Sequence, residues 1–365
     1  MTCDQKANRS LMQKPTPIFD GHNDTLLRLH LRKSADPVAD FLNGGVGGHI
    51  DLPRALEGGL RAGLFAIFIP SPGKAADVEA IMSQPTYDAP LPDRCTTDAA
   101  LAETMAMAAL LFRIEARSGG RLKVCRTAAE IAATVDAGNL AAVLHIEGAE
   151  AIDAHFNNLD VLHAAGLRSL GPVWSRPNIF GHGVPFRFPS TPDTGPGLTE
   201  LGRELVRRCN AIRIAFDLSH ITEKGFWDVA ELSDAPLIAS HSNAHAVTPH
   251  ARNLTDDQLK AIGETKGIVG LNYATAFLRT DGRMRPDTPF EIMLRHIDHM
   301  VEKAGIDSVG LGSDFDGAMV PQVLGDAAGL PKLVDAMRAH GYGEAEIEKL
   351  CFGNWLRVLK ETWGG

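Results

Sequence analysis

The sequence predicts an α/β protein in a single domain, built as a TIM-like (β/α)8 barrel. Its 365 residues contain eight short apolar runs that are typical of buried strands. Helix-like segments separate most of these runs, and strands that alternate with helices indicate a parallel sheet. Eight such strands in a chain of this length favour a closed barrel. An open doubly wound sheet is the alternative, although no Gly-x-Gly-x-x-Gly motif follows the first strand to support it.

The predicted elements follow one another along the whole chain. The first strand contains Phe19 and leads into His22, and the second spans 63–70, bounded by Gly and Pro. The remaining predicted strands are 140–146, 167–174, 212–218, 236–240, 267–273 and 308–312. Helices are predicted at 97–117, 198–210, 223–232, 254–264 and 288–304. An Asp at 51, followed by Leu-Pro-Arg, predicts a further helix start.

Three segments fall outside this alternation. Residues 1–16 form a polar N-terminal extension, so the barrel is assigned to 17–365. Residues 71–94 are rich in Pro and Asp and are predicted to be a loop. Residues 177–196, rich in Pro and Phe, make the longest predicted loop, which we interpret as a lid or rim over the barrel mouth.

Composition narrows the class of protein. The net charge is −9, which argues against a nucleic-acid partner bound through its phosphates. Five scattered cysteines, none in a Cys-x-x-Cys spacing, indicate reduced thiols and a cytoplasmic protein. No segment approaches the roughly 18 consecutive apolar residues of a membrane span, and no signal peptide or lipid-anchor motif is present. We therefore expect no membrane partner.

Polar residues with metal-binding or acid–base chemistry stand where the predicted strands end. They are His22 and Asp24 after the first strand, Glu147 after the third, His220 after the fifth, His241 after the sixth and Asp314 after the eighth. The carboxyl ends of barrel strands form the active-site face, so these six side chains are predicted to converge. Imidazole and carboxylate groups suit a cation such as zinc. A single histidine is more often a core or surface residue than a metal ligand. The prediction therefore rests on the position that these residues share at the ends of predicted strands.

Three of the candidates carry further interpretations. Glu147 follows an apolar run, and because a buried carboxylate is costly without a partner, it is suited to bridging two cations. His145, two residues earlier on the same face, is interpreted as a core or supporting residue. Arg252 lies in a loop after the sixth strand, where it is equally consistent with a surface residue and with a clamp for a substrate carboxylate.

Together these motifs resemble the renal (membrane) dipeptidase family of the amidohydrolase superfamily. The motifs run in the family's order from about residue 18 to about 357: Phe-Asp-Gly-His22-Asn-Asp24, Ile-Glu147-Gly, Asp-Leu-Ser-His220, Ser-His241-Ser, Ala-Arg252-Asn and Gly-Ser-Asp314-Phe-Asp-Gly317. The resemblance implies a distorted (β/α)8 barrel with two zinc ions. His22 and Asp24 would bind the first ion, His220 and His241 the second, and Glu147 would bridge both together with a hydroxide or water.

The resemblance also implies an activity. The shared hydroxide would attack the amide bond of a dipeptide with a free C-terminal carboxylate, including dipeptides with a D residue at that position. Asp314 would shuttle the proton and Arg252 would contact the carboxylate, and a homodimer is the family habit. Another binuclear amidohydrolase (a deaminase, a lactonase or a phosphoesterase) and a non-catalytic metal-binding barrel are the alternatives.

One position departs from the family pattern. Family members carry a His at the end of the fourth strand that helps to polarise the scissile carbonyl, and Trp174 stands in that place. An indole can donate a hydrogen bond but cannot become a cation. Either His182, in the following loop, replaces this group, or the second metal ion acts alone.

Overall fold

The computed structural model of the chain describes residues 15–72 and 77–364, and confirms the predicted barrel. Of the predicted N-terminal extension, only residues 15 and 16 are among the described residues. The eight barrel strands are β1 (Ile18–Asn23), β2 (Leu60–Phe68), β5 (Leu140–Glu147), β6 (Leu167–Gly171), β8 (Ala215–Phe216), β9 (Ile238–Ala239), β10 (Ile268–Leu271) and β11 (Val309–Leu311). All of them are parallel to their neighbours.

The strands pair in the order β8-β6-β5-β2-β1-β11-β10-β9, which is their order along the chain taken around a ring. A parallel bridge between Asp217 and Ile238 brings the two ends of this order together. An additional short strand, β4 (Leu122–Val124), pairs with β5 outside the ring and was not predicted. The open doubly wound sheet is therefore wrong, and the carboxyl ends of eight strands meet at one mouth.

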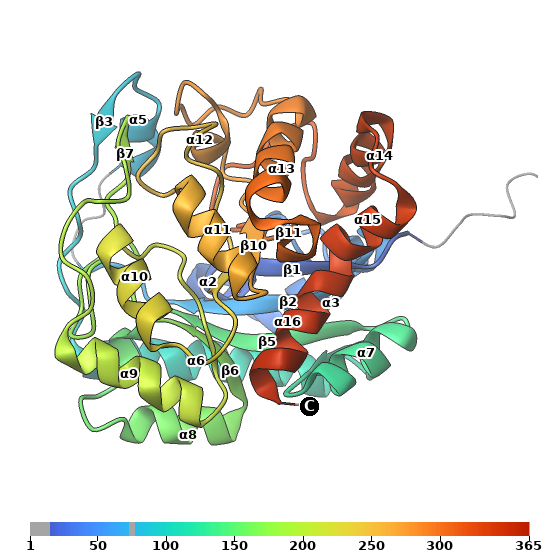
Figure 1. Cartoon of the computed structure of the whole chain (residues 1–365). Helices are drawn as coiled ribbons and strands as arrows, with labels where there is room; N and C mark the ends of the chain where they lie inside the picture. The colour runs from blue at the N-terminus through green and yellow to red at the C-terminus, as the bar shows by residue number, and fades with distance from the viewer. Residues whose placement is uncertain (1–14, 73–76, 365) are drawn as a thin grey trace, which may run out of the picture.

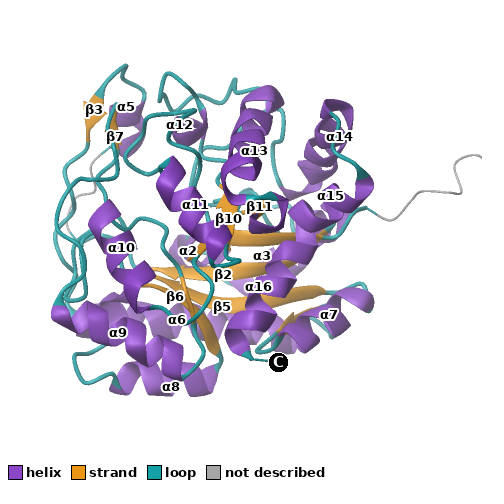
Figure 2. Cartoon of the chain, viewed as in Figure 1, coloured by secondary structure: helices purple, strands orange, loops and turns teal. Residues whose placement is uncertain are grey.

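Helices surround the strands on the outside of the barrel (Figures 1 and 2). They are α2 (Thr25–Leu31), α3 (Pro37–Asn43), α4 (Leu52–Gly58), α6 (Thr97–Arg117), α7 (Ala128–Asp136), α8 (Asn157–Ala165), α9 (Glu200–Ala211), α10 (Glu223–Leu232), α11 (Asp256–Glu264), α13 (Phe290–Ala304), α14 (Leu330–His340), α15 (Glu344–Glu348) and α16 (Asn354–Trp363). Short 3-10 turns η1 (Ala149–Ala151), η2 (Ile306–Ser308) and η3 (Ala327–Gly329) and the π-helical turn η4 (Lys349–Gly353) complete the set. The predicted helices 97–117 and 223–232 match α6 and α10 residue for residue.

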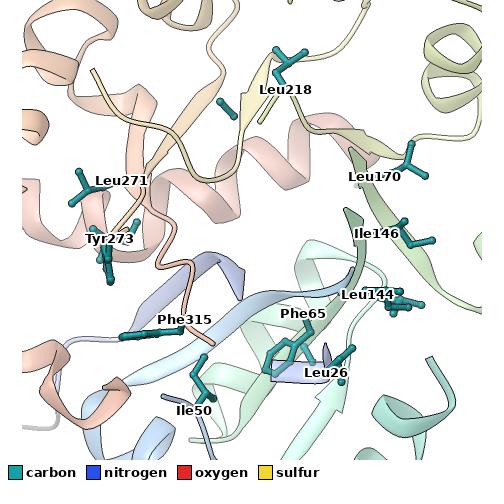
Figure 3. Packing of buried hydrophobic residues seen from close by; sticks show 14 of the residues in the cluster. Leu26, Ile50, Phe65, Leu144, Ile146, Leu170, Leu218, Leu271, Tyr273 and Phe315 are labelled. Atoms are coloured by element: carbon teal, nitrogen blue, oxygen red, sulfur yellow. The ribbon is translucent and has the colours of Figure 1, made fainter. Parts of the chain in front are cut away.

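Side chains alternate between two apolar layers because successive residues of a strand point to opposite faces. In β5, Leu144 and Ile146 belong to the outer layer that packs against the helices, whereas Ala141 and Val143 belong to an inner cluster that α16 closes with Trp355. Figure 3 shows members of the outer layer distributed around the strands. The same alternation places His145 and Glu147 on the inner face of β5.

A small structure stands beside the barrel mouth, within segments that the sequence predicted to be loops. Residues 71–94 contain α5 (Val78–Met82) and strand β3 (Tyr87–Asp88), and β3 pairs antiparallel with β7 (Arg187–Phe188) from the predicted lid 177–196. These elements lie at the same end of the molecule as α12 (Thr275–Leu278) and share a separate apolar cluster with it (Figure 1). Two-residue strands are too short to leave a period in the sequence, so the loop prediction for 71–94 was wrong in part.

Two further observations concern the helices. His296 of α13 is fully buried, where its Nδ1 accepts from the Ala244 N–H and its Nε2 donates to the Leu278 carbonyl. Among residues 15–72 and 77–364, none of the helices has both the length and the apolar character to cross a bilayer.

Candidate metal centre and active site

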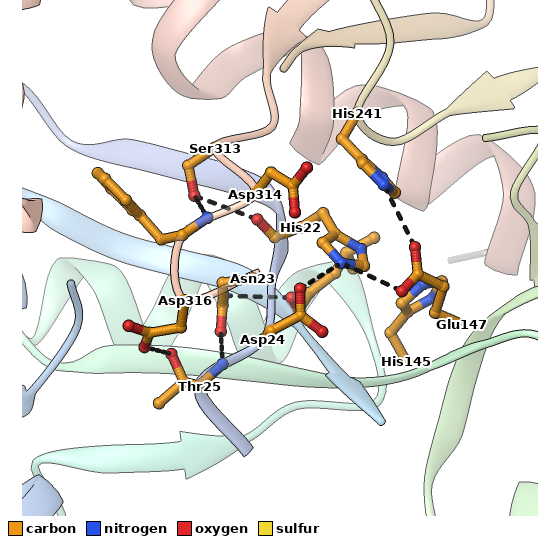
Figure 4. Close-up of polar contacts among 12 residues, drawn as sticks. His22, Asn23, Asp24, Thr25, His145, Glu147, His241, Ser313, Asp314 and Asp316 are labelled. Atoms are coloured by element: carbon orange, nitrogen blue, oxygen red, sulfur yellow. Dashed lines mark hydrogen bonds and ion pairs between the residues drawn. The ribbon is translucent and has the colours of Figure 1, made fainter. Parts of the chain in front are cut away.

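The six predicted strand-end residues meet inside the barrel mouth, and none is more than 9% exposed. His22 is the penultimate residue of β1, Glu147 ends β5, and His241 and Asp314 follow β9 and β11 (Figure 4). His220 lies four residues after β8, the strand opposite β1 in the ring, and completes the group from that side of the barrel. Residues almost three hundred positions apart in sequence therefore share one small volume, as the strand-end argument predicted.

Glu147 is the residue that the others face. Its Oε1 atom lies 3.0 Å from the Nε2 of His220 and 3.3 Å from the Nε2 of His241, while its Oε2 lies 3.8 Å from the Nε2 of His22. The two carboxylate oxygens of Glu147 therefore lie near histidines from different strands: Oε1 near His220 and His241, and Oε2 near His22. This is the arrangement that a carboxylate between two cations requires.

Asp24 reaches the cluster from just beyond β1. The strand ends at Asn23, and Asp24 is the N-cap residue of α2, one position beyond the strand. Its Oδ2 nevertheless lies 3.3 Å from the Nε2 of His22. Gly317 makes room for it, since a Cβ there would lie 2.0 Å from Asp24 Oδ2.

The donor set fits a metal centre. His22, Glu147 and His241 form one group whose ligand atoms lie within 4.8 Å of one another, and His22, Asp24 and Asp314 form a second. Two buried atoms of this set, His22 Nδ1 and Asp24 Oδ1, have no hydrogen-bond partner in the described part of the chain. Because unpartnered buried polar atoms are costly, their presence here is explained most simply by a cation that the set receives.

The electrostatics of the cluster point the same way. Burial raises the pKa of Glu147 to about 8 against the pull of His22, and burial also raises the pKa of Asp314. Burial alone would lower the pKa of His22, but Glu147 and Asp24 outweigh it and raise that pKa to about 10. Both raised pKa values mean that His22 and Glu147 tend to hold protons at neutral pH when no cation is bound. Bound cations would take the place of those protons.

Hydroxyl groups orient the two histidines that follow β8 and β9. The Nδ1 of His220 lies 2.9 Å from Ser175 Oγ, and the Nδ1 of His241 lies 2.7 Å from Ser240 Oγ. Ser240 Oγ in turn donates to the buried carboxylate of Asp217 at 2.5 Å. Each imidazole therefore presents Nε2 to the cluster, as in many metal sites where the second ring nitrogen is held by an outer partner.

The backbone is also constrained at this site. His220 and Asp314 have positive φ angles of 69° and 59°, which non-glycine residues adopt rarely. Asp314 is fixed there by its own N–H, which donates to the His22 carbonyl at 3.0 Å, and by Asn272, whose Nδ2 donates to Asp314 Oδ2 at 3.0 Å. Such strained residues concentrate at functional sites.

Arg252 is not a surface residue. It is 3% exposed, donates to Ser242 Oγ at 3.0 Å and to the His241 carbonyl at 2.9 Å, and stands 5.8 Å from the centre of the Phe277 ring. Burial lowers its pKa to about 10, partly offset by the carboxylates of Asp314 and Glu147. Its Nε has no partner among the described residues. A buried cation with a free donor beside the cluster is equipped to bind an anion.

A pocket of about 240 Å³ opens over the cluster. Asp24, Glu147, His220 and Asp314 form its polar floor. Its walls are apolar and come from α2, β2, α5 and α12 and from the loops that follow β6, β10 and β11: Leu27, Phe68, Val78, Met82, Trp174, Phe186, Ala274, Phe277, Met284 and Ala318. The pocket is small and suits a compact substrate with polar groups toward the floor.

Trp174 lines this pocket, but His182 does not. The Nδ1 of His182 is 3.4 Å from the Gly197 carbonyl, and its own carbonyl accepts from the Thr222 N–H. The alternative that His182 replaces the missing family histidine therefore finds no support in its position. His145 lies on the inner face of β5 outside both ligand groups, with its Nδ1 2.9 Å from Ser169 Oγ, as expected of a supporting residue.

Sequence reasoning missed several residues that hold the site together. Asp20 accepts from both the N–H and the hydroxyl of Ser313, at 2.6 and 2.8 Å, and so ties β1 to the loop that carries Asp314. Asp217 accepts from the N–H groups of Ser219 and Ser240, and so joins the loop of His220 to the loop of His241. Both carboxylates stand within the motifs already quoted, two or three residues before a predicted ligand, which is the signal that could have found them.

Comparison with known proteins agrees with the site. The family model described as membrane dipeptidase (peptidase family M19) matches residues 5–363. A crystal structure of a metallo peptidase from Rhodobacter sphaeroides, liganded with a phosphinate mimic of the dipeptide L-Ala-D-Ala, is 55% identical, covers 96% of this chain and 100% of its own, and superposes with a TM-score of 0.94. Dipeptidase tcpJ of Claviceps purpurea is 28% identical over 94% of this chain and 76% of its own length. An uncharacterised protein encoded in the pqqA 5′ region of Klebsiella pneumoniae is 50% identical over 70% of this chain and 94% of its own length.

The chain therefore belongs to the membrane dipeptidase family, peptidase family M19, and is a metallo-dipeptidase. The fold had been predicted from the alternation of strands and helices, and the family from the motifs. A metal follows from the family, and the His and carboxylate groups at the strand ends are where the structure could hold it.

Proposed function

We propose that the protein is a dipeptidase that works with two zinc ions. His22 and Asp24 would hold the first ion, His220 and His241 the second, and Glu147 would bridge them. The observation that carries this proposal is the position of Glu147, whose two oxygens face His22 on one side and the His220–His241 pair on the other. Imidazole nitrogen and carboxylate oxygen together are a donor set that zinc accepts.

When bound, such a pair of ions supplies an activated water at neutral pH and polarises the scissile carbonyl. The residues of the chain then position the substrate and move the proton. Asp314 stands beside Asp24 and His22 with its carboxylate steered by Asn272, so we assign to it the transfer of the proton from the attacking water to the leaving amine. Arg252 would bind the C-terminal carboxylate, which fixes the amide bond over the cluster.

The substrate that we propose is a small dipeptide with a free C-terminal carboxylate, including those with a D residue at that end. The pocket of about 240 Å³ with apolar walls suits two small side chains. The dipeptide mimic bound by the Rhodobacter protein has an L-Ala-D-Ala skeleton, which is consistent with this size. Residues 177–196 would form the rim of the mouth, since Phe186 lines the pocket and β7 pairs with β3.

Residues 17–365 would act as one barrel domain, with 1–16 as an extension. We also propose a cytoplasmic location without membrane or nucleic-acid partners and a homodimer, on the grounds of composition, charge and family habit.

Metal analysis combined with a substrate panel tests the proposed function. The purified protein would be stripped of metal, reloaded with zinc, and assayed on dipeptides that vary in C-terminal residue and chirality. We expect two zinc ions per chain and hydrolysis of L-Ala-D-Ala that rises with zinc content. One ion per chain at full activity would contradict the bridged pair, and hydrolysis of lactones, phosphoesters or aminopyrimidines in preference to dipeptides would contradict the substrate class.

A further inference from the structure

Two cavities of similar size meet at one aromatic wall. Beside the pocket over the cluster lies a second chamber of about 250 Å³, on the side away from the metal-binding candidates. Val78, Trp174 and Phe186 line both cavities. Of these three residues, Trp174 is the one that stands where the family pattern has a histidine.

The indole of Trp174 packs against three neighbouring rings. It meets the Phe68 ring edge to face at 4.8 Å and the Phe186 ring edge to face at 5.6 Å, and its centre is 5.9 Å from the imidazole of His220. Edge-to-face aromatic contacts at these distances are attractive. Trp174 therefore closes the pocket at its end next to His220.

A buried ion pair holds this wall in place. The guanidinium of Arg176, which is fully buried, lies 5.7 Å from the Trp174 ring centre and 2.9 Å from the carboxylate of Glu150. It also donates to Ser71 Oγ at 2.9 Å and to the Ile69 carbonyl at 3.1 Å. The loop that carries Trp174 is thereby tied to the loop after β2, so the indole is a fixed partition.

The second chamber is suited to an apolar group. Three of the residues that line it are prolines, Pro72, Pro90 and Pro92, which carry no backbone N–H. Its two serine hydroxyls are already engaged, that of Ser71 with Arg176 and that of Ser175 with His220. Among the described residues that line the chamber, Asp93 is the charged one, and it is exposed to solvent.

The position of Arg252 indicates which end of a bound dipeptide lies next to Trp174. Arg252 stacks on Phe277, whose ring centre is 5.8 Å from that of Phe186, and Phe186 in turn contacts Trp174. Arg252 does not itself line the pocket, but Phe277 and Phe186 do, and these two rings separate it from Trp174 along the pocket wall. A dipeptide with its carboxylate at Arg252 directs its N-terminal residue toward Trp174.

We propose that Trp174 limits the N-terminal residue of the substrate to a small side chain, and that the chamber behind it is a preformed subsite for a large apolar side chain on that residue. This inference rests on the proposed orientation of the dipeptide. In the wild-type protein the partition excludes such side chains from the chamber, and removal of the indole joins the two cavities.

The test compares Trp174→Ala with wild type on L-Ala-D-Ala, L-Phe-D-Ala and L-Trp-D-Ala. The measured quantity is the ratio of kcat/KM for the large N-terminal residue to that for alanine. We expect this ratio to rise about tenfold or more, which is the discrimination that an apolar pocket typically achieves against one group. Trp227→Ala, at a partly exposed tryptophan of α10 that lines neither cavity, should leave the ratio unchanged.

A second substitution asks whether the chamber itself receives the side chain. Leu91 lines the chamber and is 40% exposed, so Leu91→Trp in the Trp174→Ala background should fill it and abolish the gain. If the rise in the kcat/KM ratio persists in the double variant, it comes from a general loosening of the pocket, and the proposed subsite is wrong. If Trp174→Ala does not fold, Trp174→Phe decides, because a smaller ring should give a smaller rise in the same ratio.

Binding provides a readout independent of turnover. Inhibition constants of phosphinate mimics with alanine or phenylalanine at the N-terminal position should show the same shift in Trp174→Ala. An unchanged ratio in both assays overturns the partition, whereas failure of the wild-type protein to hydrolyse L-Ala-D-Ala contradicts the proposed function and leaves the binding ratio as the test of the partition.

Discussion

Substitution of Arg252 by alanine separates its proposed role from a structural one. The side chain is 3% exposed and makes two hydrogen bonds, to the hydroxyl of Ser242 and to the carbonyl of His241. Its Nε remains free among the described residues, and the charges of Asp314 and Glu147 partly offset the effect of burial on the pKa of the guanidinium. A substrate carboxylate at this position would replace solvent with a buried, charge-assisted contact.

The size of the effect follows from this burial. Loss of one partner of a buried, hydrogen-bonded charge pair typically costs about 2–5 kcal/mol. At about 1.4 kcal/mol per tenfold change, kcat/KM for L-Ala-D-Ala should fall by about 30-fold to several thousand-fold. The amide of the same dipeptide carries no charge, and loss of a hydrogen bond from the charged guanidinium to a neutral acceptor, about 1.5–3 kcal/mol, should lower its kcat/KM by about 10- to 140-fold.

The assay is therefore a pair of kcat/KM values, for L-Ala-D-Ala and for its C-terminal amide, in wild type, Arg252→Ala and Arg252→Lys. Arg252→Lys retains the charge without the planar fork and should fall between the other two on the free dipeptide. Zinc content must stay at the wild-type value, since Arg252 also contacts the His241 carbonyl. Equal losses for the acid and the amide would refute the clamp and leave Arg252 as a support for the His241 loop.

Three other substitutions test separate parts of the site. Asp314→Asn should lower kcat by about 10²- to 10⁴-fold with zinc content retained, and near-normal turnover would remove its proton-transfer role. Ser240→Ala breaks the link between Asp217 and His241 and should weaken zinc binding by about 10- to 100-fold in a competition titration, whereas an unchanged affinity would make the link irrelevant. Arg176→Met leaves Glu150 buried without its partner and should lower the free energy of unfolding by about 3–5 kcal/mol in urea titrations, with a loss below 1 kcal/mol counting against the ion pair as a support.

The barrel can be predicted from the sequence because each of its strands is buried on both faces and therefore appears as an apolar run. The run 63–70, for example, is apolar throughout between Gly63 and Pro70, so strands can be recognised without an alignment. The elements beside the mouth carry no such signal. β3 and β7 are two residues long, lie about a hundred residues apart and are defined by their pairing with each other, which no local pattern can reveal.

The candidate site divides along the same physical line. The sequence predicted the positions of His22, Glu147 and His241. In a parallel barrel, a polar residue at the carboxyl end of an apolar strand lies at the mouth of the barrel. Arg176 was not, because its partner Glu150 is twenty-six residues away and its burial results from packing between loops after different strands. The residue types that bind a metal thus follow from strand register, whereas the wall beside Trp174, which would decide what enters the pocket, follows from contacts between loops. Relatives that share every ligand can therefore differ in substrate, because a change at Trp174 or in its support alters the pocket and leaves the strand ends as they are.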